Sequence, residues 1–306
     1  MTALTKRPLL PVLAVLTLLP AVSAAGADKA ADGAYTIPNS HVLSVRSELG
    51  RRDYELYVRL PISYEDEAER RYPVLYLLDA EYSFAIASSI VQHLEERNNL
   101  KELILVGVAY PRKDRENYRL NRSRDYTPTH TLHGGYGEKY QRNSGGGETF
   151  LKILKTELIP YIEQRFRTME GERGIAGHSY GGLFATFALT ADPSVFNRYI
   201  VVSPSYWYDD KVIFRLEAEQ AGRIADLPAD LFIAVGAYEN QPENGRAMVD
   251  DVKAFARRLR TRGFNSLDMR VMVLPDETHN TVFPSALSWG LRAHYWRSPQ
   301  NRDSGG

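Results

Sequence analysis

The sequence predicts an α/β protein whose mostly parallel central sheet is covered by helices on both faces. Short runs rich in Val, Ile and Leu alternate along the chain with stretches of helical spacing, and this alternation is typical of a buried parallel sheet. The chain has 306 residues, of which 43% are hydrophobic. It can therefore bury one large core without disulfides or metal ions.

The individual elements follow from short apolar runs and from helical periodicity. Runs rich in branched side chains are the predicted strands, and the stretches of helical spacing between them are the predicted helices. The predicted strands are 53–61, 71–80, 102–110, 175–178, 198–204, 230–237 and 268–275. The predicted helices are 83–97, 149–167, 183–191 and 245–262.

One long segment, 111–147, fits neither pattern. It is rich in Arg, Tyr, Gly and Asn. A connection of this length without structure of its own is uncommon inside a compact domain. We therefore expect it to be a functional excursion over the edge of the sheet.

Composition excludes several kinds of protein. Basic and acidic residues number 38 each, so no net field draws the chain to nucleic acid or to a membrane surface. The chain has no cysteine, which excludes thiol catalysis and thiolate metal ligands. The histidines lack the spacing of metal ligands. We expect neither a metal nor a cofactor.

The amino terminus predicts a secretory signal peptide over residues 1–27. Basic residues precede an apolar run at 9–19, and small residues follow it. Cleavage is expected after Ala24 or Ala27. An uncleaved membrane anchor is the alternative, but the run is short for a spanning helix, and prolines lie within it and just after it. The prediction is a periplasmic or secreted protein without stable membrane insertion after cleavage.

The stretch RGIAGHSYGGLFA, residues 173–185, places Ser179 in the pattern Gly-x-Ser-x-Gly between a predicted strand and a predicted helix. A nucleophile on so sharp a turn has strained backbone angles, and its neighbours two positions away must be small. Gly177 and Gly181 meet that requirement. The helix start offers the N–H of Tyr180 to an oxyanion. An ordinary glycine-rich turn is the alternative, and the flanking strand and helix favour the nucleophile.

A serine nucleophile needs a base within hydrogen-bond reach. In α/β-hydrolases the order along the chain is Ser, then Asp or Glu, then His. Two histidines follow Ser179: His279 lies in a loop after a predicted strand, and His294 lies in an amphipathic stretch. We predict that His279 is the base and that His294 is a structural helix residue. His178, beside the nucleophile, is expected to pack or to hydrogen-bond nearby.

The acid that orients the base is expected after the next strand along the chain. Glu239 follows the predicted strand 230–237 and lies where the acid of the triad belongs. Glu243 and Asp251 are nearby alternatives. Asp276 is close to the base in sequence, but an aspartate in such a loop is usually a solvated turn residue.

The oxyanion hole needs a second N–H besides that of Tyr180. In this type of active site it comes from the loop after an early strand. Here that loop follows LYLLDA, and the backbone N–H of Glu81 or of Ala80 is the expected donor.

Several motifs joined along the chain resemble one family. They are PVLYLLDAEYSF, RSRDYTPTH, GGGETFLKILKTELIPYIEQRFRT, GIAGHSYGGLFATFAL, FNRYIVVSPSYWYDD and the loop of His279. From about Tyr54 to Trp296 the chain resembles the esterase branch of the α/β-hydrolases that includes esterase D and the trilactone esterases of enterobactin-, salmochelin- and bacillibactin-type siderophores.

The resemblance implies an α/β-hydrolase fold and a serine esterase mechanism without a cofactor. For the closest periplasmic members it implies hydrolysis of siderophore ester bonds. Ala80 departs from the family, because relatives usually carry glycine after Leu-Leu-Asp. The acid also varies in the family, and some members work largely as a Ser-His pair, which bears on Glu239.

Two features suggest how a substrate is chosen. Arg124, in the basic segment 112–125, is predicted to direct its fork of donors into the cleft toward an anionic or catecholate-like group. A solvated basic face is the alternative. Trp207 and Tyr208, with Tyr206, are predicted to pack on an aromatic acyl group. They could equally form a hydrophobic plug beneath the loop.

The sequence favours an exported serine esterase whose partner is a small-molecule ester, with a ferric catecholate trilactone as the favoured substrate. An esterase for hydroxycinnamoyl or carbohydrate esters is one alternative. A non-catalytic α/β-hydrolase scaffold is the other, but loss of the serine, the histidine or the elbow glycines is then expected, and all of them are present. The sequence does not indicate the oligomeric state.

The expected organisation has four parts. The signal peptide, 1–27, is followed by a linker and first-strand region, 28–50. The α/β-hydrolase catalytic domain covers 51–297. A disordered tail, 298–306, ends the chain.

Export predicts the amino terminus of the mature protein. Amino-terminal sequencing of protein from the producing cell should find Ala25 or Asp28 as the first residue. Cytoplasmic protein that still begins at Met1 would contradict the signal peptide.

Overall fold

The computed structural model describes residues 35–97, 99–111, 114–241 and 246–296. The predicted signal peptide 1–27, the tail 298–306 and the alternative acid Glu243 lie outside the described residues. None of the helices in the described part of the chain has the length and apolar character needed to span a bilayer.

Eight strands form one sheet in the order β1-β2-β4-β3-β5-β6-β7-β10. β1 and β2 pair antiparallel, as do β2 and β4, and all other neighbours pair parallel. The strands are β1 (Ser40–Ser47), β2 (Arg52–Arg59), β3 (Tyr72–Leu77), β4 (Ile104–Ala109), β5 (Thr168–His178), β6 (Arg198–Val202), β7 (Ala229–Gly236) and β10 (Leu267–Leu274). Each predicted strand is present, and β1 lies in the predicted first-strand region.

Helices cover both faces of this sheet. They are α1 (Ala80–Glu96), α2 (Arg115–Asp125), α3 (Glu138–Gln141), α4 (Gly147–Ile153), α5 (Ile159–Glu163), α6 (Tyr180–Ala191), α7 (Tyr208–Ala221), α8 (Met248–Arg262) and α9 (Val282–Tyr295). A π-helix, η1 (Leu154–Leu158), joins α4 to α5, and β8 (Asn240–Gln241) pairs with β9 (Arg246–Ala247) in a short hairpin.

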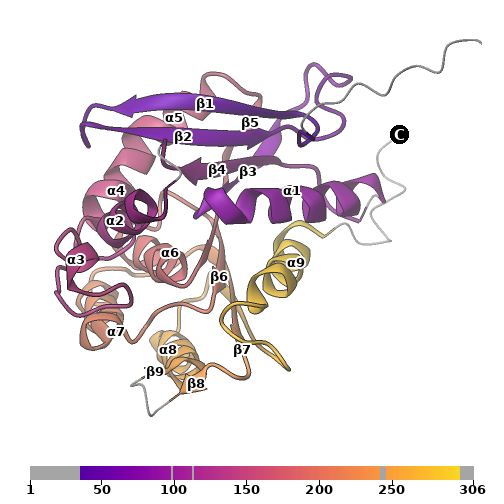
Figure 1. The fold of residues 1–306 in the computed structure, drawn as a ribbon. Coiled ribbons are helices and arrows are strands. Elements are labelled where there is room, and N and C mark those ends of the chain that lie inside the picture. The colour runs from indigo at the N-terminus through magenta and orange to yellow at the C-terminus, as the bar shows by residue number, and fades with distance from the viewer. Residues whose placement is uncertain (1–34, 98, 112–113, 242–245, 297–306) are drawn as a thin grey trace, which may run out of the picture. The chain divides into compact units, whose positions relative to one another are not determined.

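Alternating side chains of the central strands enter two separate hydrophobic clusters. In β6, Tyr199 and Val201 pack in the cluster that includes residues of α4, α6 and α8. Ile200 and Val202 pack in the cluster formed with α1 and α9. Figure 1 shows α1 and α9 on the opposite side of the sheet from α4 and α6. Burial on both faces explains why these strands read as continuous apolar runs, and it confirms the predicted α/β-hydrolase fold class.

The excursion 111–147 contains helix α2, which the apolar pattern does not predict. The residues that α2 buries are Arg122, Ser123 and Asp125, so it has no apolar stripe. Its beginning does carry a sequence signal, because the side chain of Asp114 accepts a hydrogen bond from the N–H of Asn117 at 2.8 Å. Helix α7 was likewise not predicted, and the predicted helix 149–167 is divided by η1.

Candidate active site

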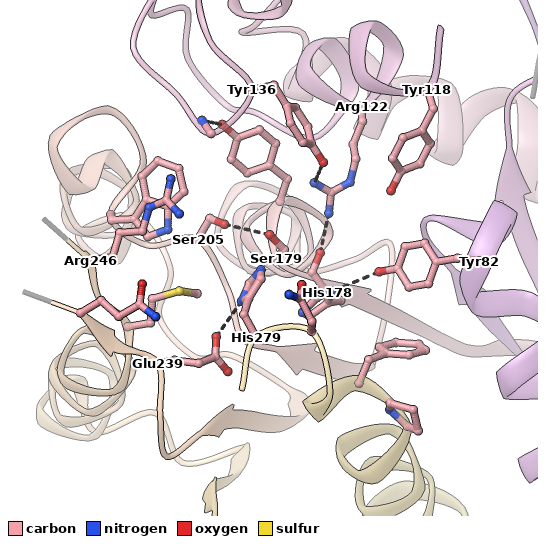
Figure 2. Close-up of a pocket in the computed structure, with 18 of the residues that line it drawn as sticks. Tyr82, Tyr118, Arg122, Tyr136, His178, Ser179, Ser205, Glu239, Arg246 and His279 are labelled. Carbon is pink, nitrogen blue, oxygen red and sulfur yellow. Dashed lines mark hydrogen bonds and ion pairs between the residues drawn. The ribbon is translucent and has the colours of Figure 1, made fainter. Parts of the chain in front are cut away.

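A pocket of about 740 Å³ lies at the carboxyl edge of the parallel strands. Ser179 directly follows β5, Ser205 follows β6, Glu239 follows β7 and His279 follows β10, and all four line the pocket. The carboxyl edge is where open α/β sheets bind their ligands. The sheet therefore brings together residues that lie far apart in the sequence (Figure 2).

Ser179 occupies a sharp turn between β5 and α6. Its backbone has φ 62° and ψ −115°, a conformation that costs a non-glycine residue free energy. A Cβ atom on Gly177 would lie 2.3 Å from the carbonyl oxygen of Gly181. Glycine is therefore required at position 177, and the turn has the geometry predicted for a nucleophile.

The side chains of Glu239 and His279 are hydrogen-bonded to each other at the side of the pocket. His279 Nδ1 lies 2.6 Å from Glu239 Oε2. The other carboxylate oxygen, Oε1, accepts hydrogen bonds from Ser203 Oγ at 2.5 Å and from the N–H of Gly236 at 2.7 Å. The side chain of Glu239 is almost fully buried. Both of its oxygens are thus engaged, and the carboxylate is fixed beside the imidazole.

The alternative carboxylates contact other groups. Asp251 pairs with Lys211 Nζ at 2.8 Å. Asp276 accepts a hydrogen bond from the hydroxyl of Tyr238 at 2.8 Å. Neither of them pairs with His279 among the described residues.

Figure 2 shows the imidazole of His279 between Glu239 and Ser179. In this structure the hydroxyl of Ser179 lies 3.2 Å from the hydroxyl of Ser205. Ser205 was not predicted as a site residue. Ser205 contacts Ser179 because β5 and β6 are neighbours in the sheet, and the local sequence does not reveal this pairing.

A second histidine lies against the first. The ring of His178 is tilted over that of His279, with 4.6 Å between centroids, and its Nδ1 lies 3.1 Å from the hydroxyl of Tyr82. Burial, with His279 adding to it, lowers the pKa of His178 well below its ordinary value. His178 therefore packs and hydrogen-bonds beside His279, and it also lines the pocket. His294 lies on α9, where its Nε2 is 3.0 Å from the carbonyl oxygen of Tyr199.

The two predicted oxyanion donors begin helices. Tyr180 is the first residue of α6, and the first N–H groups of a helix have no partner within it. Glu81 is in the first turn of α1, and its carboxylate accepts a hydrogen bond from the N–H of Tyr110 at 2.9 Å. Burial raises the pKa of Glu81 to about 7. From this turn it is Tyr82 that lines the pocket.

The arginine that enters the pocket is Arg122 rather than Arg124. Arg122 donates to both oxygens of Asp79, at 2.6 and 2.9 Å, to the carbonyl oxygen of His178 at 2.9 Å and to the hydroxyl of Tyr136 at 2.8 Å. Its side chain is 4% exposed. The hydrogen bonds of the Arg122 guanidinium therefore join α2 to the turn after β3 and to the turn that carries Ser179.

The prediction for Arg124 is wrong because the segment is helical. Residues that are two apart on an α-helix are separated by a rotation of about 200° about its axis, so the side chains of Arg122 and Arg124 face opposite ways. Arg124 lies outside the pocket lining and pairs with Asp125, at 2.8 and 3.0 Å. The buried Asp125 also accepts from Arg52 and Tyr54.

The three aromatic residues after β6, 206–208, have two different structural roles. Trp207 lines the pocket, and the guanidinium of Arg246 lies 4.7 Å from its ring centroid. Tyr208, which was predicted to contact substrate, is fully buried and donates to the carbonyl oxygen of Thr129 at 2.9 Å. Tyr206 is buried as well. These two tyrosines form the hydrophobic plug that was the alternative interpretation.

Two further arginines, Arg115 and Arg246, line the pocket. Neither has a carboxylate within ion-pair distance among the described residues, whereas Arg122 is paired with Asp79. Within the described ranges no three His, Asp or Glu side chains converge as a metal site. The pocket therefore joins a serine, an imidazole-carboxylate pair, aromatic faces and arginines that pair with no carboxylate in the described part of the chain.

Residues 47–256 match the family model described as "Putative esterase". The chain belongs to this esterase family.

Relatives of known structure or name support this assignment. The ferri-bacillibactin esterase BesA of Bacillus subtilis is 27% identical over 268 residues, 85% of this chain and 90% of that protein. The siderophore triacetylfusarinine C esterase of Aspergillus fumigatus is 28% identical over 282 residues, 83% of this chain and 92% of that protein. A crystal structure of an IroE-like serine hydrolase from Shewanella oneidensis has a TM-score of 0.73 and 32% identity, covering 83% of this chain and 79% of that one. The predicted resemblance to siderophore esterases is confirmed.

Removing Arg122 should destabilise the fold, because Asp79 would remain as a buried charge without its cationic partner, with the hydroxyl of Tyr118 still donating to it at 2.8 Å. Arg122→Met is expected to lower the free energy of unfolding by about 3–5 kcal/mol. Urea unfolding followed by circular dichroism measures the change. Arg215→Met is a suitable control, since Arg215 forms an exposed pair with Glu219 on α7 and should cost less than about 1 kcal/mol.

The pair can be isolated by a double-mutant cycle. Asp79→Asn combined with Arg122→Met should be more stable than the sum of the two single losses predicts. Strict additivity, or an Arg122→Met protein as stable as its parent, would contradict the importance of the pair.

Proposed function

We propose that the chain is an exported serine esterase that hydrolyses siderophore ester bonds. Ser179 is the nucleophile, His279 the general base and Glu239 the acid that orients it. The observation that carries the proposal is the shared pocket, in which a serine on a strained strand-to-helix turn faces an imidazole paired with a buried carboxylate.

In the first half of the reaction, Ser179 Oγ attacks the ester carbonyl carbon while His279 Nε2 takes the hydroxyl proton. The negative charge then develops on the carbonyl oxygen. The N–H of Tyr180 and an N–H of the turn after β3, that of Glu81, stabilise it. Collapse of this intermediate breaks the ester bond, and His279 gives its proton to the departing alcohol.

In the second half, water replaces the alcohol. His279 takes a proton from the water as it attacks the acyl-serine, and returns a proton to Ser179 when the acid product leaves. Glu239 accepts a hydrogen bond from the Nδ1–H of His279 throughout, so that the Nε2 lone pair stays directed at the nucleophile. The bonds to Ser203 and Gly236 hold the carboxylate in this orientation.

The pocket chemistry supports a ferric catecholate trilactone as the substrate. Such a ligand carries several negative charges and flat aromatic rings. Arg115 and Arg246 offer cations that pair with no carboxylate among the described residues, and Trp207, which Arg246 contacts, offers an aromatic face at the same pocket. The names of the relatives support siderophore esters in general, since one acts on ferri-bacillibactin and another on triacetylfusarinine C. A neutral acyl or hydroxycinnamoyl ester would leave the arginines unused.

The predicted signal peptide 1–27 supports action outside the cytoplasm, in the periplasm or the medium. The catalytic domain in this proposal spans 51–297. A ferric siderophore arriving from outside would meet the enzyme there.

The catalytic assignment predicts a graded set of losses. Ser179→Ala and His279→Ala should each reduce kcat by about 10⁴-fold or more, because each removes a group that acts on the reacting atoms. Glu239→Gln should cost less, because it acts through the imidazole. The double variant of Ser179 and His279 should be little worse than either single variant.

A fluorophosphonate probe should label Ser179 alone, as peptide mass spectrometry can establish. Full esterase activity in Ser179→Ala would refute the assignment. If Glu239→Gln is silent while Asp251→Asn is not, only the acid is misassigned.

The substrate assignment predicts a selective effect on binding. Arg246→Ala should raise KM for a ferric tricatecholate trilactone by about 5- to 10-fold, the value of a partly exposed charge-assisted contact. The kcat/KM for a neutral p-nitrophenyl ester should stay within about twofold, because that ester carries no charge to recognise.

Arg142→Ala is the matched control, since Arg142 is exposed, pairs with Glu138 and lies outside the pocket lining. Equal losses on both esters in Arg246→Ala would assign that residue a structural role. An enzyme that ignores every catecholate trilactone and hydrolyses neutral or hydroxycinnamoyl esters well would contradict the siderophore proposal.

A further inference from the structure

The turn 203–205, Ser-Pro-Ser, directly follows β6 and contacts two of the candidate catalytic residues, Ser179 and Glu239. Ser203 and Ser205 are both buried, with exposures of 0% and 1%. The N–H of Ser203 donates to the carbonyl oxygen of Ala234 at 2.7 Å, and that of Ser205 donates to the carbonyl oxygen of Ser179 at 3.1 Å. The backbone of this turn is therefore joined both to β7 and to the nucleophile.

The two hydroxyl groups of the turn contact opposite ends of the proposed triad. Ser203 Oγ donates to Glu239 Oε1 at 2.5 Å, and Ser205 Oγ lies 3.2 Å from Ser179 Oγ. Figure 2 shows the contact between Ser205 and Ser179 beside the imidazole of His279.

The backbone limits how far this turn can adjust. Ser203 has φ 42°, which a residue with a side chain adopts only when its surroundings impose it. The ring of Pro204 fixes the next φ. Pro204 also lies close to α6, since a Cβ atom on Gly182 would be 3.1 Å from Pro204 Cα. The two hydroxyls consequently have a fixed spacing.

The direction of the hydrogen bonds follows from the chemistry of the groups. A carboxylate only accepts, so Glu239 requires the proton of His279 on Nδ1, and the lone pair is then on Nε2. To react, Ser179 must direct its own proton to that lone pair. Either hydroxyl could donate in the contact between Ser205 and Ser179. When the proton of Ser179 is directed to His279, as the proposed function requires, Ser205 is the donor and Ser179 Oγ the acceptor.

We propose that the turn 203–205 is a positioning element that sets both ends of the triad. This inference rests on the proposed function. Ser205 occupies a lone pair of Ser179 Oγ and leaves the proton of Ser179 to His279. Ser203 occupies Oε1 of Glu239 and leaves Oε2 to His279.

Deleting either hydroxyl should slow the chemical step and leave substrate binding unchanged. Ser203→Ala removes a bond to a carboxylate and should lower kcat by about 10- to 100-fold, whereas Ser205→Ala removes a bond between neutral groups and should lower it by about 3- to 10-fold. KM for a p-nitrophenyl ester should stay within about twofold in both. The rate of inactivation by a fluorophosphonate should fall in parallel with kcat.

Two further variants separate the hydroxyl from the fold. Ser203→Gly lacks the hydroxyl but suits φ 42° without strain, so it should be folded and as slow as Ser203→Ala. Ser205→Thr keeps a hydroxyl and should recover most of the rate lost in Ser205→Ala. Ser88→Ala is the control, because Ser88 is a buried serine of α1 whose hydroxyl has no partner among the described residues, and its kcat should equal that of the parent.

The outcomes distinguish this inference from the proposed function. If the probe labels Ser179 in the parent but Ser203→Gly and Ser205→Ala keep the parent kcat and inactivation rate, the positioning role is wrong and the triad stands. A folded Ser205→Thr as slow as Ser205→Ala would overturn the role of that hydroxyl. If the probe does not label Ser179 at all, the proposed nucleophile is wrong, and the inference falls with it.

Discussion

The buried pair of Arg122 and Asp79 is the interaction on which the architecture of the pocket depends. The fully buried residues of helix α2 are polar, and Tyr118 is its partly buried residue that packs against the hydrophobic core, so polar contacts contribute much of its docking. Two parallel hydrogen bonds from Arg122 to Asp79 dock the helix, together with those that Asp125 accepts from Arg52 and Tyr54. The guanidinium of Arg122 also reaches the carbonyl oxygen of His178. A paired charge of this kind requires close to ideal geometry, because a misplaced partner would leave an unpaired ion in a low-dielectric interior. The position of the excursion is consequently specified sharply.

The rest of the pocket is specified by the sheet. Ser179, Glu239 and His279 each follow a parallel strand within a few residues of its end. Because neighbouring strands are held in register by their ladders, as His178 is beside Val202, the starting points of these loops are fixed relative to one another. Short connections from rigid elements keep functional groups in place better than long loops do. Glu239 is positioned by its place after β7, so its position does not depend on a contact with the segment 111–147.

The elements that the sequence predicts correctly are those whose signals are local. Apolar runs locate the strands, and the spacing of Gly177, Ser179 and Gly181 locates the strained turn. The order of Ser179, Glu239 and His279 along the chain, each after a predicted strand, predicts that they line one pocket. Helix α2 is missed because its pattern of burial is polar, and the choice of Arg124 over Arg122 follows from that omission. The residues Tyr82 and Ser205 have no local signal, because their contacts join segments distant in sequence.

The backbone of Ser179 has a consequence for the evolution of the chain. A glycine would adopt φ 62° and ψ −115° with less strain than the serine does. The difference in conformational free energy is about 1–3 kcal/mol if the strain resembles that of other such residues. Selection for thermal stability alone would therefore favour chains in which Ser179 has been replaced by glycine. If Ser179 has the proposed catalytic role, activity and maximal stability make opposite demands on this position.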